Sequence, residues 1–209
     1  MTEPDIIEPE MNAALQRAVA VDPDRLAEMR ARLAHTADAE GVLDIAYRLV
    51  DTAVGSLLLA ATGTGLVRVA YANEDHDRVL RALSDRISPR ILHHPARLDD
   101  AAHQLDEYFA GQRTSFDLRL DWRLSGGFRA TVLQHLTDVE YGHTASYARV
   151  AELAGRPKAF RAVGTACSTN PIPVVVPCHR VVRSDGSLGE YLGGTAAKAI
   201  LLALEQAAA

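Results

Sequence analysis

The chain has 209 residues, of which 48% are hydrophobic and 23% are charged, and this composition is typical of globular rather than disordered proteins. A chain of this length can bury a sizeable core, either as one large domain or as two small ones. It contains no apolar run long enough to span a membrane, and its acidic N-terminus, MTEPDIIEPEMN, has no apolar segment and therefore does not resemble a secretory signal.

The net charge of −5 is unevenly distributed along the chain. Residues 126–183 contain seven lysines and arginines and three acidic residues, so this segment carries +4 and the remainder −9. A basic segment joined to an acidic one is a pattern found where one half of a protein meets phosphate. Scattered, solvated arginines would produce the same count, so charge alone leaves both interpretations open.

The first predicted element is a helix over residues 21–35, VDPDRLAEMRARLAH. Asp22 is a suitable N-cap and Pro23 suits the first helical position. Leu26, Met29 and Leu33 recur at spacings of three and four, which indicates one apolar face.

Further along, residues 47–73 alternate β-rich runs with the turn sequences AVGS and TGTG, which predicts two or three short antiparallel strands. Residues 75–87 and 97–112 are predicted as amphipathic helices, and residues 114–122, TSFDLRLDW, as another strand. The two glycines in RLSGGF, at 123–128, indicate a domain boundary.

Beyond this boundary, three helices are predicted over residues 128–142, 144–155 and 156–170. A short turn containing Gly155 separates the second helix from the third, and this arrangement is typical of a helix-turn-helix. Most helix pairs with a short turn are simply packed helices, so the signal is weak alone. The third helix is rich in small residues, with Arg161 as its one prominent cation, which suits close approach to a groove.

The chain has two cysteines, Cys167 and Cys178, too few for a metal site or a disulfide framework. We therefore expect two free thiols, no bound metal and a reducing, cytoplasmic location. Cys167 is expected to be a small hydrophobic residue within a helix. Cys178 ends the segment NPIPVVVP, which we interpret as a stiff buried strand, and the adjacent His179 is a base that could activate the thiol.

The string NPIPVVVPCHRVV, followed by SDGSLGEYLGG and KAILLALE, closely resembles the O6-alkylguanine-DNA alkyltransferases, also called methylated-DNA–protein-cysteine methyltransferases. The hallmark of that family is Pro-Cys-His-Arg preceded by Asn-Pro-x-Pro, which here spans Asn170 to Arg180. SYARVAELAGRPKAFRAVG resembles the helix-turn-helix of the family. The resemblance is strong from Phe128 to Glu205 and looser from Tyr47 to Trp122, and residues 1–44 have no counterpart in it.

The resemblance implies an α+β fold, with a small N-terminal antiparallel sheet domain of the ribonuclease H-like kind and a C-terminal helical domain of the winged helix-turn-helix type. We expect a helical N-terminal extension over residues 1–44, the N-terminal domain over 45–125, and the DNA-binding, alkyl-accepting domain over 126–209.

The resemblance also implies a single-use repair enzyme that acts on double-stranded DNA, as a monomer, without a cofactor and away from membranes. Its alkyl group would move irreversibly from O6-alkylguanine, or from O4-alkylthymine, to Cys178, after the base is flipped out through the minor groove. His179 would act as a base through water, and Glu205 would orient it. Tyr147 would protonate N3 of the guanine and crowd the target phosphate.

Arg161 would fill the place vacated in the base stack, and Asn170 would turn the chain between the recognition helix and the active-site segment. Further DNA contacts implied by the resemblance are Ser146, Arg156, Lys158, Ala159, Thr165, Ser168 and Arg180. The base pocket would be lined by Asn170, Val181, Gly189, Tyr191, Leu192 and Gly193.

Three departures from the family pattern bear on these roles. Leu192 stands where the family usually has a small residue, Glu190 adds an acid beside the pocket, and Ser168 replaces a residue that is often basic. No cysteine precedes Cys167, so we expect no zinc site of the kind found in some family members.

Two other functions fit parts of the sequence. A non-catalytic binder of alkylated DNA would share the helix-turn-helix, but known relatives of that kind lack the cysteine. A thiol hydrolase could use a Cys-His pair, but it would also need an oxyanion hole, which no other motif suggests.

Overall fold

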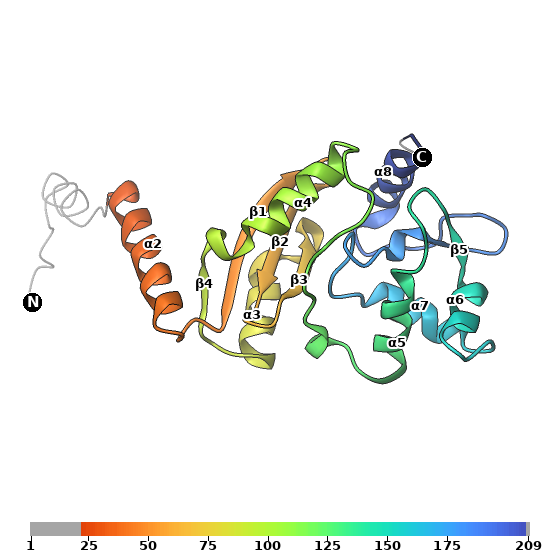
Figure 1. Cartoon of the computed structure of the whole chain (residues 1–209), viewed down its shortest axis with the longest axis horizontal. Coiled ribbons are helices and arrows are strands. Elements are labelled where there is room, and N and C mark those ends of the chain that lie inside the picture. The colour runs from red at the N-terminus through yellow and green to blue at the C-terminus, as the bar shows by residue number, and fades with distance from the viewer. Residues whose placement is uncertain (1–21, 208–209) are drawn as a thin grey trace, which may run out of the picture.

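The computed structural model describes residues 22–207, which form a sheet domain and a helical domain side by side (Figure 1). The helices and strands of the first half are α2 (Pro23–Ala39), β1 (Ile45–Thr52), β2 (Gly55–Ala61), β3 (Leu66–Tyr71), α3 (His76–Arg86), β4 (Ile91–His93) and α4 (Asp99–Phe109). Those of the second half are α5 (Gly127–Leu136), β5 (Ala145–Ser146), α6 (Tyr147–Leu153), α7 (Phe160–Ser168), β6 (Val181–Val182) and α8 (Gly194–Ala207).

The four-stranded sheet has the order β3-β2-β1-β4. The pairs β1–β2 and β2–β3 are antiparallel, as predicted, whereas β4 pairs with β1 in parallel. The antiparallel pairing predicted within residues 47–73 is therefore confirmed, whereas β4, which the sequence analysis did not predict, makes the sheet mixed. β4 follows α3, which crosses over one face of the sheet and returns the chain in the direction of β1.

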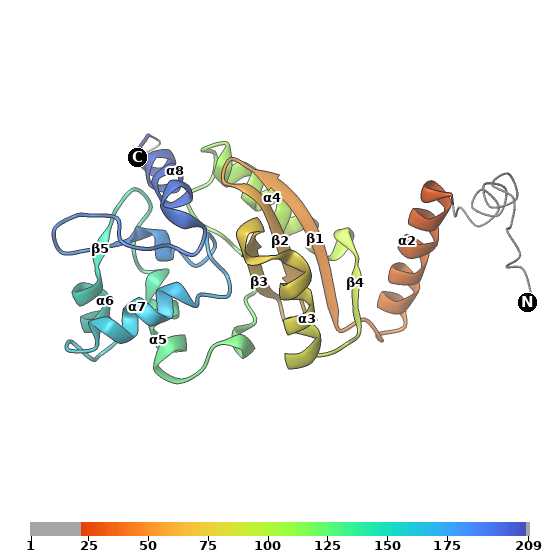
Figure 2. The same cartoon turned by 180° about the vertical axis from the view of Figure 1, so that it is seen from behind.

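Helices cover both faces of this sheet, α4 on one and α3 on the other (Figures 1 and 2). Alternate residues of β2 pack into the cores on the two faces of the sheet. Leu57 and Leu59 belong to the core beneath α4, and Leu58 and Ala60 belong to the core beneath α3. This double burial explains why β2 is an uninterrupted apolar run rather than an alternating one.

The prediction of a strand over residues 114–122 is wrong. The segment is extended and meets the sheet at a single bridge between Leu66 and Leu120. It cannot pair further along β3, because the next part of that edge is occupied by the segment that leads into Cys178, where the Val69 amide donates to the Pro171 carbonyl at 2.8 Å.

The second half has the three predicted helices, with boundaries that differ from the predictions. α5 ends at Leu136 rather than near Gly142, because residues 137–143 form turns instead. α6 and α7 pack against each other and against α5, joined through residues 154–159, which confirms the helix-turn-helix arrangement. β5 and β6 form a small parallel pair beside them.

The segment that leads into Cys178 is a compact turn and not the predicted strand. Val174 has a φ of +73°, a left-handed conformation that is unusual for a β-branched residue, and Pro173 and Val176 form an isolated bridge. Prolines at 171, 173 and 177 lack backbone N–H groups, so this segment cannot take part in a regular strand ladder.

The helix α2 confirms the predicted cap, since the Asp22 side chain accepts from the Asp24 amide at 3.0 Å. Its predicted apolar face does not pack on the domain, because Met29 and Leu33 are 59% and 57% exposed. The helix is attached through its C-terminal half, where Ala34 is buried and Asp38 pairs with Arg97. No helix within residues 22–207 has both the length and the apolar character needed to cross a membrane.

Candidate active site and DNA-binding surface

Cys178 is the first residue of a 3-10 turn over Cys178–Arg180, and it is 2% exposed. The Asn170 side-chain amide donates to the Cys178 Sγ at 3.1 Å and to the Val176 carbonyl at 2.8 Å. Its oxygen accepts from the Ile172 amide at 3.0 Å, so Asn170 makes hydrogen bonds to three residues of this turn. Burial raises the pKa of Cys178 to about 11, and the hydrogen bond from Asn170 offsets part of that rise. Cys178 is therefore a thiol at rest, with one donor in place to stabilise the thiolate.

His179 is fully buried and lies 2.8 Å from Glu205, measured from Nε2 to Oε1. Burial opposes the ionisation of Glu205, but hydrogen bonds from His179 and Arg180 outweigh it and lower its pKa to about 2. Because an ionised carboxylate only accepts hydrogen bonds, Nε2 carries the imidazole proton. Burial lowers the pKa of His179 despite the carboxylate, so the ring is neutral. Its Nδ1 has no hydrogen-bond partner among the described residues, so its lone pair is available as a base.

Arg180 is part of this buried network and not of the surface. Its guanidinium donates to Glu205 at 2.9 and 3.0 Å and to the Val139 carbonyl at 2.5 Å, and the residue is 6% exposed. The prediction that Arg180 contacts DNA is therefore wrong. The carboxylate of Glu205 holds the guanidinium inside the domain, where it balances the buried negative charge.

The N-terminal domain adds groups to the site that the sequence analysis missed. The Tyr108 hydroxyl, on α4, donates to Glu205 Oε1 at 2.7 Å, and the Tyr71 and Tyr191 hydroxyls lie 2.8 Å apart. A third missed residue, Lys198 on α8, is fully buried and donates to the Val181 carbonyl at 2.6 Å. Tyr71 and Lys198 stand among mostly apolar residues and Tyr108 follows two acidic ones, so no shared local pattern marks these contacts.

A cavity of about 440 Å³ lies between α6, α7 and the loop after β6. It is lined by Tyr147, Phe160, Gly164, Thr165, Cys167, Ser168, Arg183, Gly189 and Glu190. Burial raises the pKa of Tyr147, so its hydroxyl keeps its proton and can donate. Gly189 has a φ of +65°, and a Cβ there would lie 3.2 Å from the Tyr147 hydroxyl, so the lack of a side chain keeps this wall open.

The other predicted pocket residues lie around this cavity rather than in its lining. The Tyr191 ring packs edge-on to the His179 ring, with centroids 6.3 Å apart. A Cβ at Gly193 would lie 2.6 Å from the Tyr71 ring, so this glycine permits close packing against the sheet domain. Val181 is fully buried in β6. Leu192 lines a different cleft, between the two domains, and does not line this cavity.

The predicted DNA contacts, apart from Arg180, lie on one part of the helical domain. Arg156, Lys158, Arg161, Thr165 and Ser168 are exposed, and Ala159 is partly exposed, along α7 and the turn before it. Ser146 caps α6, because its Oγ accepts from the Arg149 amide at 3.1 Å. A residue missed in the sequence is Phe160, which is 49% exposed at the cavity rim, with the Arg161 guanidinium 5.9 Å from its ring centroid.

Comparisons with known proteins agree for both halves of the chain. Residues 45–122 match the family model described as the ribonuclease-like domain of 6-O-methylguanine DNA methyltransferase, and residues 127–207 match the model for its DNA-binding domain. The methylated-DNA–protein-cysteine methyltransferase of Mycobacterium tuberculosis is 39% identical over 168 residues, which cover 79% of this chain and 94% of that protein. The constitutive enzyme of Bacillus subtilis is 35% identical over 164 residues, covering 77% and 94%.

Solved structures show the same relationship. The crystal structure of the M. tuberculosis O6-methylguanine methyltransferase superposes with a TM-score of 0.69 at 37% identity, over 79% of this chain and 94% of that one. A structure of the M. tuberculosis protein in complex with DNA superposes with a TM-score of 0.67, over 78% and 94%. The chain therefore belongs to the methylated-DNA–protein-cysteine methyltransferases, the enzymes that repair DNA by transferring an alkyl group to one of their own cysteines.

Proposed function

We propose that this protein removes the alkyl group from O6-alkylguanine, and from O4-alkylthymine, in duplex DNA and retains it on Cys178. The observation that carries this proposal is that the adjacent residues Cys178 and His179 are both buried and each is held by a hydrogen bond from or to a distant side chain. Asn170 donates to the Cys178 sulfur, and Glu205 holds the His179 ring with Nδ1 unpaired among the described residues.

In the proposed reaction, His179 Nδ1 takes the thiol proton through a bridging water, and the resulting imidazolium is stabilised by Glu205. The Cys178 thiolate then attacks the alkyl carbon, so that an S–C bond forms while the C–O6 bond breaks and its electron pair passes to the purine. The Tyr147 hydroxyl donates a proton at N3 of the leaving base. The thiol proton resides on His179 and the purine takes its proton from Tyr147, so an imidazolium and a phenolate remain, and proton exchange through water returns both side chains to neutrality.

The high pKa of Cys178 fits this scheme, because the thiol then becomes a nucleophile only when His179 can take its proton. The cavity beside Tyr147 is proposed to receive the flipped base, and Arg161, exposed on α7, to occupy the gap left in the stack. A thioether is stable, so each molecule would react once.

We further infer the domain bounds, the cellular location and the oligomeric state of the protein. Residues 45–125 and 126–209 are proposed as the two functional domains, with residues 1–44 as an extension of unassigned role. Both cysteines are free, which is consistent with a reducing, cytoplasmic location. We also propose that the protein acts as a monomer, as the resemblance to this family implies.

The test is the intact mass of the protein after reaction with a duplex that contains O6-methylguanine. We expect the mass to rise once, by one methyl group, with the modification mapped to the Cys178 peptide. Cys178→Ser should bind the duplex without a mass change, and Cys167→Ser should still take up one methyl group. An unchanged mass would indicate a lesion binder, and demethylated DNA accumulating without a mass change would indicate a hydrolase.

A further inference from the structure

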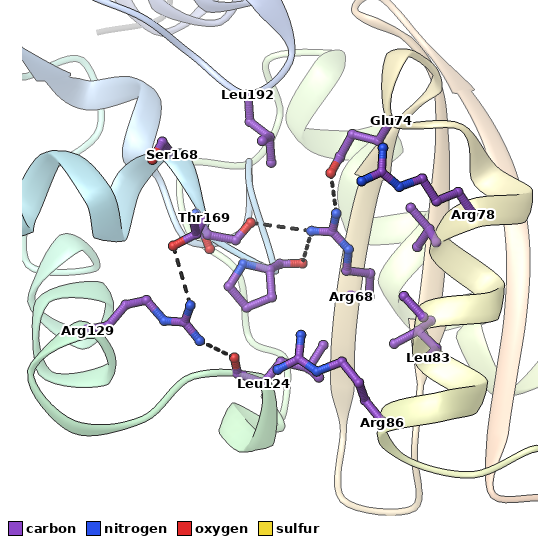
Figure 3. Close-up of a pocket in the computed structure, with 14 residues that line it drawn as sticks. Arg68, Glu74, Arg78, Leu83, Arg86, Leu124, Arg129, Ser168, Thr169 and Leu192 are labelled. Atoms are coloured by element: carbon purple, nitrogen blue, oxygen red, sulfur yellow. Dashed lines mark hydrogen bonds and ion pairs between the residues drawn. The ribbon is translucent and has the colours of Figure 1, made fainter.

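A second cleft, of about 530 Å³, lies between the two domains, where α3 faces the C-terminal end of α7. Figure 3 shows Arg78 and Arg86 extending from α3 into this cleft, with Arg68 and Arg129 on its other sides. Four arginines and one acid, Glu74, are its charged lining residues, a net charge of +3 (+4 − 1) in a chain whose total is −5. The cleft is therefore a concentrated positive site on an acidic protein.

The four arginines are not equivalent. Arg68 is paired with Glu74 and also donates to the Pro171 carbonyl at 3.2 Å, so it joins the sheet domain to the active-site turn. Arg129 donates to the Leu124 carbonyl. Arg78 and Arg86 are exposed, and their guanidinium groups have no hydrogen bond or ion pair with any residue in 22–207. These two are the cations free to bind an external anion.

The cleft is next to the proposed DNA-binding surface. Ser168, at the end of α7, lines both this cleft and the 440 Å³ cavity beside Tyr147. Thr169, the next residue, lies in the cleft and is exposed. The cleft and the cavity therefore adjoin at the C-terminal end of α7.

We propose that this cleft binds a backbone phosphate of the DNA, beyond the contacts made by the helix-turn-helix, so that the sheet domain takes part in holding the duplex. The proposal rests on DNA binding by this family. Guanidinium groups suit phosphate because their planar N–H donors match its oxygens in pairs. No aromatic ring lines the described cleft, so it offers no platform for stacking a base, and the backbone is the part of DNA that it fits.

The test uses the full chain carrying Cys178→Ser, with lesion-free duplexes, so that binding is measured without alkyl transfer. Arg78→Gln and Arg86→Gln are combined, since neither guanidinium makes a hydrogen bond or ion pair within residues 22–207. The matched control combines Arg81→Gln and Arg32→Gln, two exposed arginines outside the cleft, which changes the net charge by the same amount. Affinity is measured against salt concentration and against duplex length, extended one base pair at a time.

We expect the cleft variant to lower the slope of log affinity against log salt by about one to two, the effect of losing one or two phosphate contacts. The loss of affinity should appear only for duplexes that extend beyond α7. The control variant should bind like the parent at every duplex length. Ala82→Glu, which places a negative charge in the cleft and keeps both arginines, should weaken binding in the same length-dependent way.

Equal losses in the cleft and control variants would overturn the proposal, because they would reflect net charge alone. An unchanged slope at all lengths would also overturn it. A last experiment adds inorganic phosphate to the parent and to the cleft variant. If phosphate raises the melting temperature of the parent alone, while both proteins bind the duplex equally, the cleft is a site for small anions and the DNA proposal is wrong. None of these results affects the proposed chemistry at Cys178, because lesion-free DNA and Cys178→Ser are used throughout.

Discussion

The Tyr108 hydroxyl donates to Glu205 Oε1 at 2.7 Å, and this bond joins the two domains at the centre of the active site. The same carboxylate oxygen accepts from His179 Nε2 at 2.8 Å, and the Tyr108 hydroxyl lies 3.4 Å from that nitrogen. The sheet domain therefore helps to position the carboxylate that sets the tautomer of the histidine.

Tyr108→Phe should slow alkyl transfer by roughly tenfold, because a hydrogen bond to a charged group contributes about 1.5–3 kcal/mol and Arg180 still holds the carboxylate. Duplex affinity should not change. The measurement is the single-turnover rate against pH, since a misplaced carboxylate should also move the pH at which the rate falls. Tyr141→Phe is the matched control, because that buried hydroxyl has no partner among residues 22–207. Equal effects of the two substitutions would show that Tyr108 acts only through packing.

The stability of the protein should be greatest between about pH 6.5 and 9. Folding lowers the pKa of Glu205 from 4.5 to about 2. As the pH falls, this carboxylate is therefore protonated in the unfolded chain before it is protonated in the folded one. The stability that the ionised Glu205 contributes is lost between pH 4.5 and about 2. Burial also lowers the pKa of His179 from 6.5, so losses begin below that value. Burial raises the pKa of Cys178 from 9.0 to about 11, so its contribution is lost as the pH rises through that interval.

Urea unfolding across this pH range checks the expectation. The free energy of unfolding of Glu205→Gln should lie below that of the parent at neutral pH, and the difference should shrink below pH 4.5, where the parent loses the same charge. Cys178→Ser should flatten part of the alkaline decline. A difference between parent and Glu205→Gln that stays constant down to about pH 2 would mean that the carboxylate is not ionised in the folded protein.

Phe160→Ala should weaken repair of duplex DNA by roughly tenfold, within the range of about 1–3 kcal/mol for a stacking contact. The ring is 49% exposed at the rim of the base cavity, so removing it should cost the free protein little stability. Ile200→Ala, at a site 41% exposed on α8, is the control. A lower melting temperature with unchanged repair would show that Phe160 is a packing residue and not a DNA contact.

Arg161→Ala should slow repair in duplex DNA by roughly tenfold or more, because a guanidinium in the vacated stack offsets part of the cost of base extrusion. Free O6-benzylguanine needs no extrusion, so its reaction rate should change much less. Single-turnover rates on the two substrates measure the contrast. Equal losses on both would assign Arg161 to the fold or the pocket.

Removing residues 1–40 should leave alkyl transfer intact and lower the stability of the sheet domain. The last turn of α2 supplies Asp38, which pairs with Arg97 and lies 3.1 Å from His94 Nε2. Thermal unfolding of the truncated chain tests the expected loss of stability, and its single-turnover rate tests whether alkyl transfer is intact. In the full chain, Asp38→Asn should reproduce part of the destabilisation, whereas the exposed Asp24→Asn should reproduce little of it. A truncated chain that folds but reacts at least tenfold more slowly would make α2 part of the active unit.

Local patterns in the sequence determined the elements whose physical causes are local. The cap at Asp22 and Pro23, the tight turns of the β1–β3 meander and the helix-turn-helix follow from backbone preferences within a few residues. The motif from Asn170 to Arg180 predicted Cys178 as the alkyl acceptor through its resemblance to the family, because a cysteine next to a histidine is weak evidence by itself.

Only the tertiary structure decided the rest. The segment before Cys178 has the composition of a strand, but its prolines and the edge of β3 make it a turn. Arg180 is inside because Glu205, 25 residues later, holds it there. Tyr108 reaches Glu205 across 97 positions of sequence, and the basic cleft forms where α3 meets the end of α7. These contacts depend on how the two domains pack, and packing between distant segments leaves no periodic or local signal in either one.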